Sequence, residues 1–128
     1  MNIQRYINTT EYRQICVLKF LREFTKIPAK DIAENLKIST ASLSLIENGK
    51  READKEDISR LSNALQDRLN VSKDIEKLTE VCSDNPVLMN LLQDYDSEKR
   101  SFSTVYNIAK QIAAVSETID KQLYLSSK

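Results

Sequence analysis

The segment STASLSLIENGKR, residues 39–51, concentrates side chains suited to close polar contact with a ligand. Small hydroxyl and methyl groups come first, at Thr40, Ala41, Ser42 and Ser44. Hydroxyls can donate and accept hydrogen bonds, and short side chains let a helix approach its partner closely. An acid, an Asn-Gly pair and two cations then close the segment. Such a segment is a candidate contact surface, and the cations at its end could meet negative charge.

The composition argues against catalysis and against a metal or cofactor site. The sequence has no His, one Gly and two Cys, which lie far apart at positions 16 and 82. His is the usual general base near neutral pH, and a phosphate-cradling loop needs several glycines. Neither Cys has the close thiol or imidazole partners of a zinc site. We therefore expect no enzyme, no bound metal and no cofactor.

The balance of charges and the two cysteines indicate the kind of partner and the cellular compartment. Nineteen Lys+Arg balance nineteen Asp+Glu, so an electrostatic partner must be met by a local patch rather than by net charge. Both cysteines sit among apolar residues with helical spacing, which predicts buried free thiols in a reducing compartment, with a disulfide as the alternative. No run approaches the roughly 20 apolar residues that span a bilayer. We expect a soluble cytoplasmic protein without membrane contact.

The elements that position residues 39–51 are predicted to be helices. Apolar residues recur three and four apart almost throughout, and no run has the alternation of a strand. Thr10 predicts the start of a first helix that ends near residues 25–26, and Pro28 fits the first turn of a short second helix. Ser39 is placed to cap a third helix, and Asn48-Gly49 ends it where left-handed backbone is needed.

A fourth helix and a helical C-terminal region follow. Asp54 with Asp57 three residues on is typical of a helix cap. Ser72 and Asn85-Pro86 predict two more short helices, and a long helix is expected from about Ser103. The apolar positions predicted to face inward are Ile15, Leu18, Phe20, Leu21, Phe24, Ile32, Ala33, Leu36, Leu43, Ile46, Ile58, Leu61, Leu65, Val71, Ile75, Leu78, Cys82, Leu88, Leu91 and Leu92.

Two short helices joined by a tight turn, the second with small polar residues outward, form the pattern of a helix-turn-helix. The run LREFTKIPAKDIAENLKISTASLSLIENGKR resembles the Cro/repressor (XRE) family of DNA-binding domains over about residues 11–68. The most specific motifs for this resemblance are Ile32-Ala33, Ile38-Ser39, Leu43-Ser44 and Ile46-Glu47-Asn48-Gly49-Lys50. The resemblance implies an all-α protein: a lambda-repressor-like helix-turn-helix bundle in residues 1–70, then a helical dimerisation or interaction region in residues 71–128.

The resemblance also implies roles for individual residues. Base edges in double-stranded DNA would be read by the outward face of the third helix, at Thr40, Ala41, Ser42, Ser44 and Leu45. Phosphates would be bound around the ends of that helix, by Lys37, Ser39, Asn48, Lys50 and Arg51. Arg5 could add a phosphate contact from an N-terminal arm, and Arg22 would pair with Glu47 to fix one helix against another.

The sequence departs from the family pattern at several positions. Relatives usually carry Gly where Lys26 and Lys37 stand, in turns that tend to need left-handed backbone, at a cost on the order of 1 kcal/mol for lysine. Ala29 stands where relatives commonly have a glutamine that binds a phosphate. The long polar side chains that relatives use to read bases are missing from the third helix. Residues 11–68 hold eleven Lys+Arg and ten Asp+Glu, far from the usual basic footprint of a nucleic-acid-binding domain.

These departures leave two functions open. Methyl and hydroxyl groups can lie close to the floor of the major groove and would favour sites that contain A·T pairs. The chain would then be a sequence-specific transcriptional regulator, a dimeric repressor of a prokaryotic or mobile-element promoter. The alternative is a helix-turn-helix fold used as a protein-interaction module, such as an antitoxin or a phage-type enzyme inhibitor. The long C-terminal helix is the candidate for the homodimer seam, with apolar residues at Val105, Ile108, Ile112, Val115 and Ile119.

Overall fold

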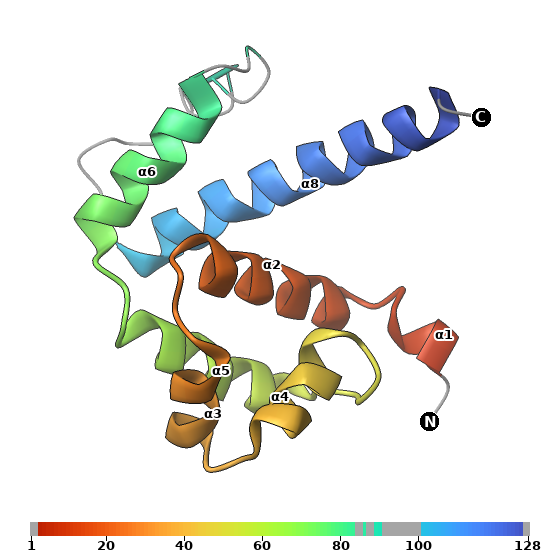
Figure 1. The fold of residues 1–128 in the computed structure, drawn as a ribbon, viewed down its shortest axis with the longest axis vertical. Coiled ribbons are helices and arrows are strands. Elements are labelled where there is room, and N and C mark those ends of the chain that lie inside the picture. The colour runs from red at the N-terminus through yellow and green to blue at the C-terminus, as the bar shows by residue number, and fades with distance from the viewer. Residues whose placement is uncertain (1–2, 84–85, 87–88, 91–100, 127–128) are drawn as a thin grey trace. The chain divides into compact units, whose positions relative to one another are not determined.

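A computed structural model of the chain describes residues 3–83, 86, 89–90 and 101–126, with the side chains of 3–4 and 115–126 excepted (Figure 1). The described residues form helices and turns and contain no strand, so the protein is all-α as predicted. The chain divides into two compact units, residues 1–69 and 70–128. The predicted burial of Leu88, Leu91 and Leu92 lies outside the described residues.

The first unit contains five helices: α1 (Ile3–Tyr6), α2 (Thr10–Phe24), α3 (Ala29–Leu36), α4 (Thr40–Glu47) and α5 (Lys55–Gln66). α2 packs on α4 and α5, and α3 packs on the same two helices. In Figure 1 α3, α4 and α5 gather on one side of α2. The helix α1 was not predicted from the sequence, because four residues are too short to show a helical period.

The helix starts follow the side chains that can cap them. Ser39 Oγ accepts from the Ser42 backbone N–H at 3.0 Å, which confirms the predicted start of α4. Asp54 and Asp57 form a reciprocal capping box at α5, with bonds of 2.8 and 3.1 Å. The cap of α2 is Thr9 rather than Thr10, and its hydroxyl accepts from the Tyr12 N–H at 3.2 Å.

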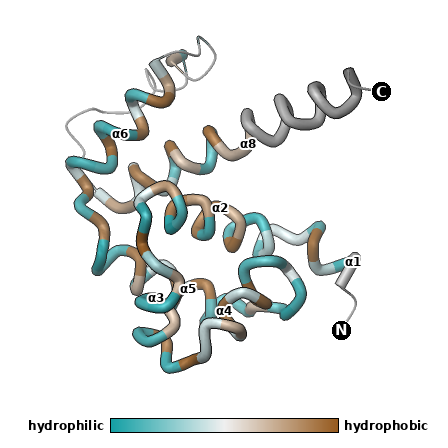
Figure 2. Tube along the Cα trace, in the orientation of Figure 1, coloured by the Kyte–Doolittle hydropathy of each residue, from teal (hydrophilic) through white to brown (hydrophobic). Residues whose placement is uncertain are grey.

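The core of the first unit is aliphatic. All the inward positions predicted in α2 to α5 are buried except Phe20 and Phe24, which are half-buried and stack on each other with ring centroids 5.7 Å apart. Figure 2 shows hydrophobic residues recurring among hydrophilic ones along these helices, as burial of one face requires. Further buried residues complete this core: Tyr6, Val17, Ile27, Ala53 and Ala64.

Left-handed backbone occurs where the sequence predicts it. Lys26 and Lys37 have φ of 60° and 59°, and Gly49 has φ of 73°. At Gly49 a second constraint applies, because an added Cβ would lie 2.6 Å from the ring of Tyr12. Gly49 is therefore required for both its backbone conformation and its contact with Tyr12, whereas the two lysines store conformational strain.

The second unit contains α6 (Val71–Ser83) and α8 (Phe102–Ser126), which pack against each other. Asn70 rather than Ser72 caps the start of α6, since its side-chain carbonyl accepts from the Lys73 N–H at 3.2 Å. The described core residues of this unit are Leu78, Cys82, Val105, Ile108, Ala109 and Ile112, together with the carboxyl-bearing Asp74. Val71 and Ile75, predicted to face inward, are only half-buried.

The prediction of two buried thiols is wrong for one of them. Cys82 is buried and Cys16 is exposed, and neither forms a disulfide. Cys16 lies between buried residues of α2 in sequence, but its position on the helical circumference points away from the core. Tyr12, one turn earlier, has its pKa raised to about 12, chiefly by burial and then by a hydrogen bond with Cys16.

We expect Lys26→Gly to increase the free energy of unfolding by about 0.5–1 kcal/mol, because glycine adopts φ of 60° without the Cβ clash that lysine suffers. Urea denaturation followed by circular dichroism would measure the change. Lys26→Ala is the matched control, since it removes the charge and keeps the Cβ. Equal stabilisation by both variants would show that charge, not backbone strain, is responsible.

Candidate nucleic-acid interface

The outward face of α4 is made of small and apolar side chains. Thr40, Ala41, Ser44 and Leu45 are exposed, and Ser42 is half-buried on the flank. Spacing of one and four residues places the four exposed positions in one compact patch on the helix surface. Leu43, Ile46 and Glu47 point into the first unit. The five side chains that the resemblance assigned to base reading therefore all lie outside the core and carry no charge.

The N-terminal end of α4 is held by serine hydroxyls. Ser39 Oγ accepts from the Ser42 N–H and donates to Ser42 Oγ at 2.9 Å. The hydroxyl of Ser39, a predicted phosphate ligand, thus bonds within the helix. Lys37, two residues earlier, is exposed in the turn between α3 and α4.

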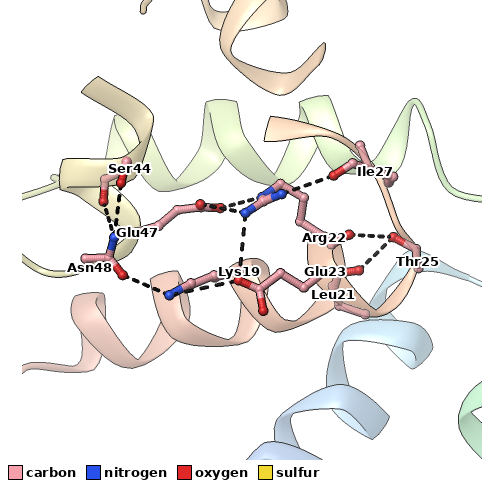
Figure 3. Close-up of polar contacts among 9 residues, drawn as sticks. All are labelled: Lys19, Leu21, Arg22, Glu23, Thr25, Ile27, Ser44, Glu47 and Asn48. Carbon is pink, nitrogen blue, oxygen red and sulfur yellow. Dashed lines mark hydrogen bonds and ion pairs between the residues drawn. The ribbon is translucent and has the colours of Figure 1, made fainter. Parts of the chain in front are cut away.

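The C-terminal end of α4 is tied to α2 by a chain of polar contacts (Figure 3). Lys19 Nζ donates to Asn48 Oδ1 at 2.9 Å, and Asn48 Nδ2 donates to the Ser44 carbonyl at 2.9 Å and to Ser44 Oγ at 3.2 Å. Asn48 is another predicted phosphate ligand, but both its amide oxygen and its amide nitrogen are engaged in these contacts. Lys19 was not predicted to belong to the site. Its only sequence signal is its place one turn before Glu23, to which it makes a long 4.0 Å ion pair.

Two exposed cations follow the end of α4. The backbone N–H groups of Lys50 and Arg51 both donate to the Leu45 carbonyl, at 2.9 and 3.1 Å, so the chain turns sharply there. Positive charge at this position also complements the negative end of the helix dipole. With Lys37 at the other end, the uncharged face of α4 has cations at both ends.

The segment before α2 is packed against the loop after α4. Tyr6 is buried, and its hydroxyl accepts from the Ala53 N–H at 3.1 Å. Burial raises the pKa of Tyr6 above its ordinary value. Arg5, expected in an N-terminal arm, lies exposed in the helical turn α1 next to this anchor, and its phosphate contact stays a prediction.

Arg22 and Glu47 form a bidentate ion pair between α2 and α4 (Figure 3). The guanidinium donates from Nε to Oε2 at 2.7 Å and from Nη2 to Oε1 at 2.9 Å, and its Nη1 donates to the Ile27 carbonyl at 3.1 Å. Only 14% and 8% of the two side chains are exposed. The hydrogen bond from Glu47 raises the pKa of Arg22 above its ordinary value, against the opposing effect of burial.

The aliphatic surroundings make each charge of this ion pair depend on its partner. Ile15, Ile32 and Leu65 line a narrow void together with Arg22 and Glu47. A carboxylate in such surroundings is stable only while its partner is present, because desolvation is otherwise uncompensated.

Neither a metal site nor a membrane-spanning helix is found among the described residues. No three of their acidic or cysteine side chains come together in a way that could hold a metal ion. No helix among them is long and apolar enough to cross a bilayer.

We expect Arg22→Ala to lower the free energy of unfolding by roughly 2–4 kcal/mol, because it leaves the Glu47 carboxylate buried without its partner. Thermal and urea denaturation would measure the loss. Arg13→Ala, on the exposed side of the same helix, is the control and should cost less than about 0.5 kcal/mol. A similar loss for both variants would contradict the importance of the ion pair.

Residues 18–70 match a family model described as helix-turn-helix. The match begins within α2 and ends just after α5, so it includes the Arg22–Glu47 ion pair, the turn at Lys37 and the whole exposed face of α4. Searches among curated proteins and among solved structures gave no significant match. Residues 18–70 of this chain therefore form a helix-turn-helix domain of the Cro/repressor (XRE) family.

Proposed function

We propose that this protein is a cytoplasmic, sequence-specific transcriptional regulator that acts as a dimeric repressor at a prokaryotic or mobile-element promoter. One observation carries the proposal: an exposed, uncharged helix face with cations at both ends, on a scaffold fixed by a buried ion pair. In a helix-turn-helix domain such a helix enters the major groove.

The two parts of the face have different tasks in this mechanism. Thr40, Ala41 and Ser44 lie against base edges, where short side chains allow close approach to the groove floor. Lys37, Lys50 and Arg51 lie at the helix ends, where they meet the phosphate backbone on either side of the groove. Lys19 adds a fourth cation beside Asn48, with 32% of its side chain exposed.

A dimer follows from the size of the face. One two-turn helix contacts only a few base pairs, and two copies placed one helical turn of DNA apart roughly double the binding free energy. We propose that α8 supplies the contact between copies. Val105, Ile108 and Ile112 are buried within a single chain. Ile119 and Val115 therefore carry the proposed seam, on the sequence pattern alone.

A protein partner remains the second candidate. Leu45 is 38% exposed on the same face, and the first unit has almost no net charge. Both features suit a protein surface better than a phosphate backbone. Titration against random duplex DNA at low and moderate salt separates the candidates, because DNA binding weakens steeply as salt is added. Absence of binding even at low salt would favour the protein partner.

We expect Arg51→Ala to weaken binding to every duplex alike and to reduce the slope of log K against log salt by about one, as for one lost phosphate contact. Fluorescence anisotropy over a salt series would measure both quantities. Lys77→Ala, an exposed cation of α6 in the second unit, is the matched control. An unchanged slope in Arg51→Ala would remove Arg51 from the interface.

We expect Ala41→Glu to abolish sequence-specific binding, because a bulky acid would stand between the helix and the groove floor. The residue is exposed, so the fold should survive, which circular dichroism can verify. DNase footprinting on the selected site is the measurement. A footprint that survives this change would mean that α4 does not enter the groove.

We expect the wild-type chain to be a dimer at micromolar concentration by light scattering. Ile119→Lys should produce a folded monomer if the later part of α8 forms the seam. Ile112→Lys is the contrasting variant and should unfold the second unit, because Ile112 is buried within one chain. A monomeric wild type would exclude the dimer.

A further inference from the structure

We propose that α4 reads thymine, through its C5-methyl group and its O4 acceptor together. The inference rests on the proposed function and adds the chemistry of the DNA site to it. Its basis is the direction in which the outward hydroxyls of α4 donate and accept, which the hydrogen bonds at both ends of the helix determine.

Ser44 is fixed as an outward donor by Asn48. Lys19 Nζ can only donate, so the amide oxygen of Asn48 must face it, at 2.9 Å. The amide nitrogen then faces Ser44 and donates to its carbonyl and its Oγ. Because Ser44 Oγ accepts this bond, the hydroxyl proton of Ser44 remains available to an acceptor on a ligand that lies against the exposed face.

Ser42 is oriented in the same sense by Ser39. The Ser42 N–H occupies Ser39 Oγ as an acceptor, and the Ser39 proton is donated to Ser42 Oγ at 2.9 Å. The proton of Ser42 is thereby directed away from the helix cap. Two hydroxyls of α4, at Ser42 and Ser44, thus present donors.

The carboxylate and amide acceptors near this face are already occupied. The Asn48 carbonyl receives Lys19, and the Glu47 carboxylate receives Arg22. Without a carboxylate or amide oxygen directed outward, the exposed face of α4 could meet the amino group that cytosine presents in the major groove only through hydroxyl lone pairs, which are weaker acceptors than a carboxylate. Thymine instead presents an acceptor, O4, beside a methyl group.

Methyl contacts complete the match. Ala41 and Leu45 are exposed beside the hydroxyl of Ser44, and Thr40 adds a methyl one turn before it. Donors alone would accept thymine O4, adenine N7 or the two acceptors of guanine, and methyl contacts alone would accept any C5-methyl pyrimidine. The two requirements together select thymine.

Modified bases test the two requirements separately. After selection of a site from random duplexes, each thymine is replaced by uracil, which lacks the methyl group, or by 5-methylcytosine opposite guanine, which keeps the methyl group and exchanges O4 for an amino group. Each contacted thymine should lose about fourfold in affinity on replacement by uracil, as for one buried methyl group. Replacement by 5-methylcytosine should cost more, since the donor then meets a donor.

The role of Asn48 is tested by Asn48→Asp. The new carboxylate would still accept from Lys19, and it would also accept the proton of Ser44 and turn it inward. We expect the affinity ratio of thymine to 5-methylcytosine duplexes to fall at least to the value of Ser44→Ala, because the turned hydroxyl presents an acceptor instead of a donor, with no further fall in the double variant. The ratio is the readout because the added charge weakens binding to every duplex alike.

The outcomes distinguish this inference from the proposed function. Failure to bind any duplex at low salt would overturn both. Salt-dependent, sequence-specific binding that is unaffected by uracil, or equally tight with 5-methylcytosine, would overturn only the reading of thymine. A further fall of the ratio when Ser44→Ala is added to Asn48→Asp would show that Asn48 does not orient the hydroxyl.

Discussion

The ion pair between Arg22 and Glu47 is the constraint on which the functional face depends. Glu47 is the last residue of α4, and its carboxylate can be buried only where the guanidinium meets it. Once Glu47 points inward, the helical period turns Leu43 and Ile46 inward with it and leaves positions 40, 41, 44 and 45 outside. The pair thus sets the rotation of α4 about its own axis.

Contacts from the N-terminal part of the chain then fix the end of α4 that carries the cations. Lys19 holds Asn48, and the ring of Tyr12 lies against Gly49, where no side chain would fit. Tyr6, itself in ring contact with Tyr12 at 5.5 Å, holds the backbone of Ala53. The loop with Lys50 and Arg51 is therefore supported on both sides, so its cations start from a defined position.

Local rules were sufficient for most of the first unit. Ser39, Asp54 and Gly49 act through their own backbone or the next turn, so their caps and the left-handed position could be predicted from type and spacing. Contacts over long sequence separations could not, apart from the Arg22–Glu47 ion pair that the family resemblance implied. Nothing in the sequence around Lys19 indicates Asn48, 29 residues away, and nothing around Tyr6 indicates Ala53, 47 residues away. The donor direction of the hydroxyls depends on such contacts and was equally inaccessible.

The small net charge of the first unit has a consequence for how the protein would find its site. Glu47 is neutralised inside the fold, and the cations near α4 are few, so the long-range attraction to any duplex is weak. With few phosphate contacts, affinity still falls as salt is added, but less steeply than for a strongly basic domain. Under the proposed function, a larger share of the binding free energy would then come from contacts at the groove floor and from joining two copies. Weak attraction to random DNA makes discrimination between sites easier, because specificity is the difference between the two affinities. A recognition helix of short side chains on a nearly neutral domain is consistent with this balance.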